Sequence, residues 1–158
     1  MRTSCTLKSR LCTFNCVSAF ATAVVTNSLT ISNTVFAAAI NETFNGYSTA
    51  ISGGTVTFDC TNTNIWNVTS TITSNWTANF TNLGLSNNYS TGTTMIINQG
   101  ATAYIPTAVQ VEGNATTINW QGGSVPTGTA SKKDIVSFSV LQTGASTYLV
   151  FGQLVTFG

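Results

Sequence analysis

The clearest hydrophobic pattern in this chain is a strict alternation over residues 66–81, WNVTSTITSNWTANFT. Its even positions are apolar or small, and every odd position is Asn or Thr. Because successive side chains of a strand point to opposite faces, the pattern predicts one buried face and one uncharged face toward solvent. A single strand of this length would run about 50 Å at about 3.3 Å per residue, far longer than usual. We therefore expect two strands joined by a bend at residues 70–74. The side chains expected to be buried lie at even positions, namely Val68, Ile72, Trp76 and Phe80. Those expected to be exposed lie at odd positions, namely Asn67, Thr71, Asn75, Thr77 and Asn79.

Shorter alternating segments between turn signals fill the rest of the chain. We expect strands at residues 28–35, 55–60, 93–98, 116–120, 135–141 and 146–157. Glu112-Gly113-Asn114 has the composition of a tight turn, and Pro106 indicates a sheet edge or a bulge. The last strand is apolar on both faces over residues 148–151, which predicts a central strand or a subunit contact.

These segments predict an all-β fold, because none shows the period of an amphipathic helix. The natural architecture is an antiparallel β-sandwich, and a jelly roll is one candidate form of it. The length of 158 residues suits one domain. We assign residues 26–158 to the sandwich and residues 1–25 to an N-terminal arm or a first strand.

The N-terminal segment has two further interpretations. Three basic residues precede an apolar-leaning run, and residues 19–21 resemble a signal-peptidase site. Polar residues interrupt the run, which is also much shorter than the ~20 apolar residues of a membrane span. An arm or first strand is therefore favoured over a cleaved signal peptide, and no membrane partner is expected. If the arm docks on a partner, its cations would steer the encounter; these are Arg2, Lys8 and Arg10. Its apolar side chains would provide the affinity; these are Leu7, Leu11, Phe14 and Val17.

Charge is unusually scarce in this sequence. Charged residues make up 6% of the chain, against roughly 25% in ordinary soluble domains. A surface with so little repulsion is typical of a protein that assembles, so we expect self-association. No Lys or Arg lies between Leu11 and Ser131, which excludes nucleic-acid binding by the body of the protein.

Catalytic groups are also few. The chain has no His, and its four carboxylates are Glu42, Asp59, Glu112 and Asp134. A glycosidase needs two carboxylates facing each other across a bond, and the residues around Asp59 and Glu112 do not indicate such a pair. We therefore expect no enzymatic activity and assign no catalytic residue.

The cysteines indicate neither a metal site nor a disulfide framework. Three crowd the N-terminal segment, at positions 5, 12 and 16, without the two close pairs of a four-thiolate zinc site. Cys60 shares the parity of Val56 and Phe58, which favours a small buried hydrophobe. Six Asn-X-Ser/Thr sequences occur, and the Asn/Thr alternation itself produces three of them, so glycans are not expected. No metal or cofactor is predicted.

Four segments carry a resemblance to a known family. They are NWTANFTNL (75–83), INQGATAYIP (97–106), VQVEGNATTINWQGGSVP (109–126) and SKKDIVSF (131–138). They resemble a β domain of virion proteins from marine tailed phages, particularly cyanophages, over about residues 54–158. The N-terminal third and its cysteines are not matched. The resemblance implies a fibre, spike or decoration protein on the outer surface of the particle, without enzymatic activity or catalytic residues.

Two functional expectations follow. The chain has neither heptads nor a shaft, which favours a capsid decoration or knob protein over a tail fibre. Its partner would be the major capsid protein or another virion protein. The alternative is a tail-fibre or receptor-binding module in which Tyr104, Trp120 and the Thr/Asn loops hold a host-surface glycan. The strand parity of these two aromatics favours core packing instead.

Overall fold

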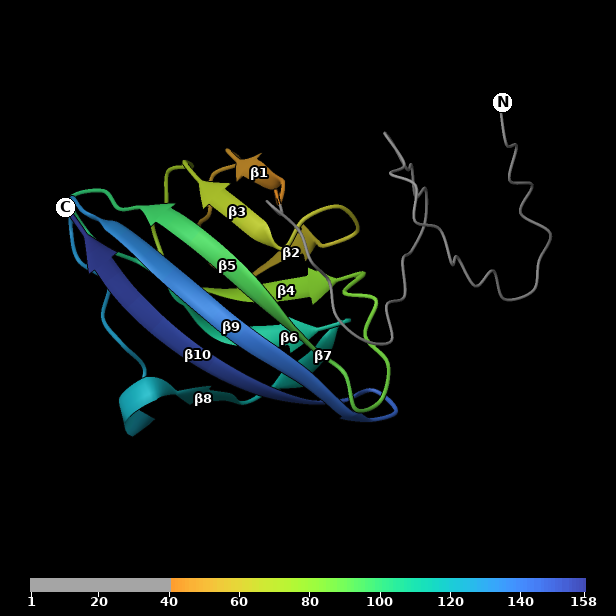
Figure 1. The fold of residues 1–158 in the computed structure, drawn as a ribbon. Helices are drawn as coiled ribbons and strands as arrows, with labels where there is room; N and C mark the ends of the chain where they lie inside the picture. The colour runs from red at the N-terminus through yellow and green to blue at the C-terminus, as the bar shows by residue number, and fades with distance from the viewer. Residues whose placement is uncertain (1–40) are drawn as a thin grey trace, which may run out of the picture. The chain divides into compact units, whose positions relative to one another are not determined.

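The computed structural model describes residues 41–158, which fold into two packed β-sheets (Figure 1). One sheet has six strands in the order β1-β3-β5-β9-β10-β8, and the other has four in the order β2-β4-β6-β7. The strands are β1 (Phe44–Tyr47), β2 (Thr55–Asp59), β3 (Ile65–Val68), β4 (Trp76–Thr81), β5 (Ser90–Asn98), β6 (Pro106–Val111), β7 (Asn114–Thr116), β8 (Ile118–Trp120), β9 (Lys133–Gly144) and β10 (Thr147–Phe157), with one 3₁₀ turn, η1 (Gln121–Gly123). The all-β sandwich predicted from the sequence is confirmed. The predicted arm at residues 1–25 and the predicted strand at residues 28–35 lie outside the described residues.

Strands β1 to β6 form a two-sided parallel solenoid. The chain alternates between the two sheets, and each strand pairs in parallel with the strand two places along. Phe44 pairs with Ile65 and Thr55 with Thr77, so the first two coils are offset by 21 and 22 residues. A third contact between these coils joins Ile51 to Ile72 at the bend. The sequence did not reveal this repeat.

The remaining strands are mostly antiparallel. β9 and β10 form a long hairpin, and β9 also runs antiparallel to β5. β6 and β7 are joined by the predicted tight turn, in which Glu112 and Gly113 both have positive φ, at 51° and 79°. The prediction of a wholly antiparallel sandwich or jelly roll is therefore wrong for the solenoid half. Parallel pairing is possible there because each connection crosses to the other sheet before returning.

The segment over residues 66–81 forms two strands, as predicted, with the bend between β3 and β4. Trp66, Val68, Trp76, Ala78 and Phe80 are buried against the opposite sheet. Ile72 at the bend is only half-buried, which corrects one predicted core position. Of the five odd positions predicted to be exposed, Thr71 and Asn75 are exposed. The other three are half-buried, because neighbouring strands cover their flanks; these are Asn67, Thr77 and Asn79.

The core continues through the aromatic side chains of both sheets. Phe80 packs on Phe58 and Phe138 with ring centroids 5.9 and 5.6 Å apart, and Phe138 packs on Trp120 at 5.7 Å. Cys60 is buried beside this cluster, as its parity predicted. Pro106 begins β6 at a register shift against β4, which confirms the expected bulge.

A buried carboxyl group fixes the long loop before β9. Asp134 is fully buried, and its oxygens accept hydrogen bonds from Gln99 Nε2 (2.9 Å), the Thr129 backbone N–H (2.8 Å) and Thr156 Oγ1 (2.7 Å). Gly128 lies so close that a Cβ there would stand 2.9 Å from Asp134 Oδ2. The loop is therefore held against the β9–β10 hairpin by polar contacts rather than by apolar packing.

Candidate functional site on the outer face of the six-stranded sheet

The structure brings Asp59 and Glu112 to the same edge of the four-stranded sheet, which the sequence did not suggest. β2, β4 and β6 are parallel, so their carboxyl ends lie together. Asn82 Nδ2 donates to Asp59 Oδ1 (2.9 Å), and the next backbone N–H, that of Leu83, donates to Glu112 Oε1 (3.0 Å). Each carboxylate thus holds one side of the loop that follows β4.

These carboxylates are exposed and occupied by loop contacts. Hydrogen bonds from the Thr61 hydroxyl, the Asn82 amide and the Thr61 N–H lower the pKa of Asp59. Neighbouring Cys60 is shielded, and burial raises the pKa of its thiol to about 11, so the thiol stays protonated near neutral pH. Among residues 41–158, no three His, Cys, Asp or Glu side chains lie close enough to hold a metal ion.

The most distinctive surface is the outward side of the six-stranded sheet, which we call the outer face. Its central strands align in rows across the sheet because β5, β9 and β10 are in register. An apolar row is formed by Ile96, Ile135 and Val155. Two rows of mainly short side chains follow, and then a second apolar row; these rows are Thr94-Ser137-Gln153, Gly92-Ser139-Phe151 and Ser90-Leu141-Leu149.

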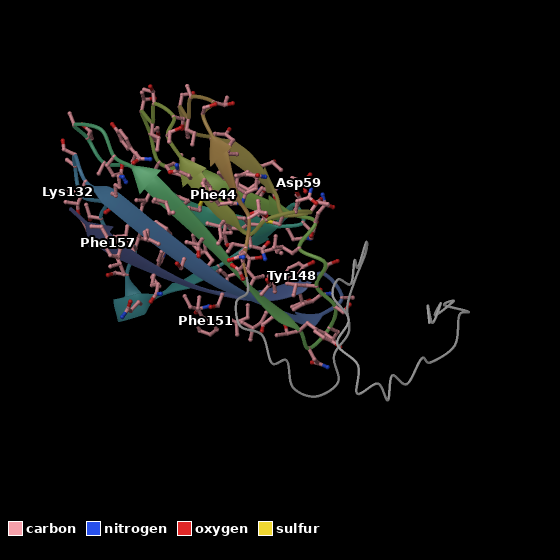
Figure 2. The ribbon with its side chains drawn as sticks, turned by 45° about the horizontal axis from the view of Figure 1, so that its top comes forward. Phe44, Asp59, Lys132, Tyr148, Phe151 and Phe157 are labelled. Atoms are coloured by element: carbon pink, nitrogen blue, oxygen red, sulfur yellow. The ribbon has the colours of Figure 1, made fainter. Side chains whose placement is uncertain are left out.

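The apolar row is exposed where it crosses β10. Val155 is 45% exposed, and Phe157, two residues further along the same face, is 52% exposed. Figure 2 shows Phe157 beside Lys132 at one end of the sandwich, with Asp59 and Tyr148 toward the other end. Apolar side chains on a charge-poor surface are typical of a surface that contacts another molecule.

Between the two apolar rows the outer face is hollowed. Phe151, Gln153, Asn119 and Gln121 border a hollow of about 400 Å³ whose other wall is Ser137 and Ser139 on β9. A second hollow of about 610 Å³ begins at Gly92 and Thr94 on β5 and extends past the start of β3 to Asn41, Glu42, Thr43 and Asn64. Gly92 pairs with Ser139, and Thr94 pairs with Ser137, so the residues that line the two hollows are direct neighbours across β5 and β9. We call the combined depression the cross-sheet groove.

The β10 end of the groove is built around Gly152. A Cβ on Gly152 would lie 2.8 Å from Trp120 Cε3 and from Ile118 Cγ2, so only glycine lets β8 pack this closely. Asn119 Nδ2 donates to the carbonyl of Val150 (3.0 Å), which ties β8 to β10 beside the exposed ring of Phe151. The close packing of β8 against the backbone of β10 therefore positions the strands that carry Trp120 and Phe151 at this end of the groove.

Tyr104 and Trp120, the two aromatics that the sequence offered for sugar binding, pack in or against the core, as their strand parity predicted. Trp120 is only 9% exposed and belongs to the core, while its edge lines the groove. Tyr104 is half-buried and packs against the core. The exposed aromatic of the groove is Phe151 at 47%, which sequence reasoning did not single out. Its signal was the apolar character of residues 148–151 on both strand faces.

No protein-family model matches the chain, and neither curated proteins nor solved structures give a significant match. Within residues 41–158, no helix is long and apolar enough to cross a membrane.

Proposed function

We propose that this chain is a non-enzymatic structural protein on the outer surface of a tailed-phage virion, and that it decorates the capsid. The observation that carries the proposal is the apolar row of the outer face, which is exposed at Val155 beside the exposed Phe157 on a nearly uncharged protein. The four segments that resemble phage virion β domains support it independently. The proposed location is the outside of the particle.

The chemistry of the apolar row indicates its partner. Burying a Val or Phe side chain contributes about 1.5–3 kcal/mol, and apolar residues of this kind form the centres of protein interfaces. Lys133 pairs with Phe157 in the row next to the apolar row, and Lys132 lines the same hollow as these two residues. The complementary surface is therefore an apolar patch with a neighbouring carboxylate, on the capsid shell protein. The N-terminal arm, as a second anchor, remains a prediction for residues outside the described part.

A decoration assay with matched variants tests this proposal. Val155→Asp places a charge in the apolar row, whereas Val125→Asp makes the same change at an exposed loop position. Purified protein is added to particles that lack it, and bound protein is measured after sedimentation. We expect Val155→Asp to fold normally and to bind at least about tenfold more weakly, because a desolvated charge would face apolar atoms. Val125→Asp should bind like the wild type. Normal decoration by Val155→Asp would refute the proposed surface.

The second candidate function is a tail-fibre or receptor-binding module, which the cross-sheet groove favours. Particles that lack the protein distinguish the two. A decoration protein leaves adsorption to host cells nearly unchanged, whereas loss of a receptor-binding module abolishes adsorption.

A further inference from the structure

The cross-sheet groove has the dimensions of a site for a chain molecule. It runs from β8 across β10, β9 and β5 to the start of β3, perpendicular to the strands. Four steps of about 4.8 Å between neighbouring strands give a length of about 19 Å. The floor is low at its centre because Gly92, Ser137 and Ser139 carry short side chains, between two rows that contain Ile, Leu and Val.

The lining of the groove is polar but almost uncharged. Hydroxyl and amide groups line it, from Asn119 and Gln121 at one end to Thr43 and Asn64 at the other. Such groups both donate and accept hydrogen bonds, which suits a ligand rich in hydroxyl groups. The ring of Phe151 provides an apolar face at the β10 end, and aromatic faces suit the C–H surfaces of sugar rings. The only charged side chain among the described lining residues is Glu42, at the far end.

We propose that the cross-sheet groove binds a neutral oligosaccharide lying across the strands, with Phe151 stacked on one sugar ring. A nucleic acid would need cations, which the described lining does not contain. A bound peptide strand would add to a sheet edge and run along the strands, whereas this groove crosses them. Glu42 repels carboxylates, so an acidic sugar is disfavoured at that end of the groove. This inference does not depend on the virion role, because it rests on the groove alone.

Two substitutions in the groove test the site from opposite directions. Phe151→Ala removes the stacking face, and Ser139→Leu fills the floor directly across from Phe151. Both positions are exposed on the outer face, so the fold should tolerate them. Val155→Asp lies outside the groove and is the control that affects only the proposed docking surface.

The probes are neutral hexasaccharides of glucose, mannose, galactose and N-acetylglucosamine, with a galacturonate hexasaccharide as the acidic counterpart, titrated into the full-length protein by calorimetry. At least one neutral hexasaccharide should bind with a dissociation constant below about 10 mM, which corresponds to weak binding. Phe151→Ala and Ser139→Leu should each weaken binding at least about tenfold, as expected for a central aromatic contact and a filled site. Val155→Asp should bind like the wild type, and Glu42→Gln should admit the acidic hexasaccharide.

Three results would overturn the proposal. They are the absence of binding to every neutral probe at 10 mM, binding that neither groove variant weakens, and equal binding of the acidic probe by the wild type. A protein that binds sugar but does not decorate particles would refute the docking proposal and leave the groove intact.

Discussion

Gly152→Ala is the sharpest test of how the β8–β10 edge is built. In the structure, the added methyl group would stand 2.8 Å from Ile118 Cγ2 and from two carbon atoms of the Trp120 ring. Carbon atoms in ordinary contact are about 3.5–4.0 Å apart, so these neighbours must retreat by about 1 Å. Neither is a flexible chain end, because one is a rigid ring and the other a β-branched side chain. β8 itself pairs with β10 over only three residues and must move as a unit.

These contacts determine how much stability Gly152→Ala should lose. Overpacking of this kind costs about 1–3 kcal/mol, and we expect the upper part of that range. Replacing glycine also reduces the entropy of the unfolded chain, which returns about 0.4–1 kcal/mol. The net loss should be about 2 kcal/mol in the free energy of unfolding, measured by urea denaturation with circular dichroism and tryptophan fluorescence.

Gly92→Ala is the matched control for this substitution. It lies in the same sheet but on its outer face, whereas Gly152 faces the interior of the sandwich. Its added methyl group would meet only the carbonyl oxygen of Phe138, at 3.9 Å. It should be neutral or stabilising by about 0.4–1 kcal/mol. In a Trp120→Leu background, the cost of Gly152→Ala should fall by at least half, because the ring that it meets is gone. A Gly152→Ala protein as stable as Gly92→Ala would refute the reasoning.

Three further outcomes are expected. Trp76→Ala should lower the free energy of unfolding by about 3–5 kcal/mol, because Trp76 is 2% exposed, whereas Phe44→Ala at a 64% exposed site should cost under about 1 kcal/mol in the same urea titration. Asp134→Ala leaves three donors without their acceptor and should cost at least about 3 kcal/mol, with new protease cleavage in the loop at residues 121–131; an unchanged cleavage pattern would contradict this. Because the pKa of Cys60 is raised to about 11 in the folded state, its stabilising effect is complete below the unfolded pKa of about 8.5 and is lost as pH rises toward 11. The wild type should therefore lose more stability than Cys60→Ala over that pH range, and equal losses would show that the thiol does not titrate with unfolding.

Much of the sandwich could be predicted because burial alone fixes side-chain parity. The alternation at residues 66–81 identified both strands, the bend and the buried tryptophans. Alternation looks the same in parallel and antiparallel sheets, so the direction of pairing could not be inferred from it. The repeat was hidden because the paired positions of its coils share only three identities, which are Ile51 with Ile72, Thr55 with Thr77 and Phe58 with Phe80. The third coil is also lengthened by the loop after β4.

The groove could not be predicted for a related reason. Gly92 and Ser139 are 47 positions apart in the sequence and become neighbours only through the register of β5 and β9. Phe151 was within reach of sequence reasoning, since the apolar character of residues 148–151 on both faces predicted either a central strand or a subunit contact. The meeting of Asp59 and Glu112 also required parallel pairing of three strands, which no local pattern reveals.

The stacked coils allow the width of the two sheets to change without a change in the β9–β10 hairpin. Each early coil spans 21–22 residues and adds one strand to each sheet, so an extra copy of it, inserted at residue 64, would widen the molecule by about 4.8 Å. The β9–β10 hairpin, with Phe151 and Val155, would keep its sequence and its neighbours. Duplication of one half of such a chain would therefore change the width of both sheets, while the strands of the other half keep their sequence and their pairing.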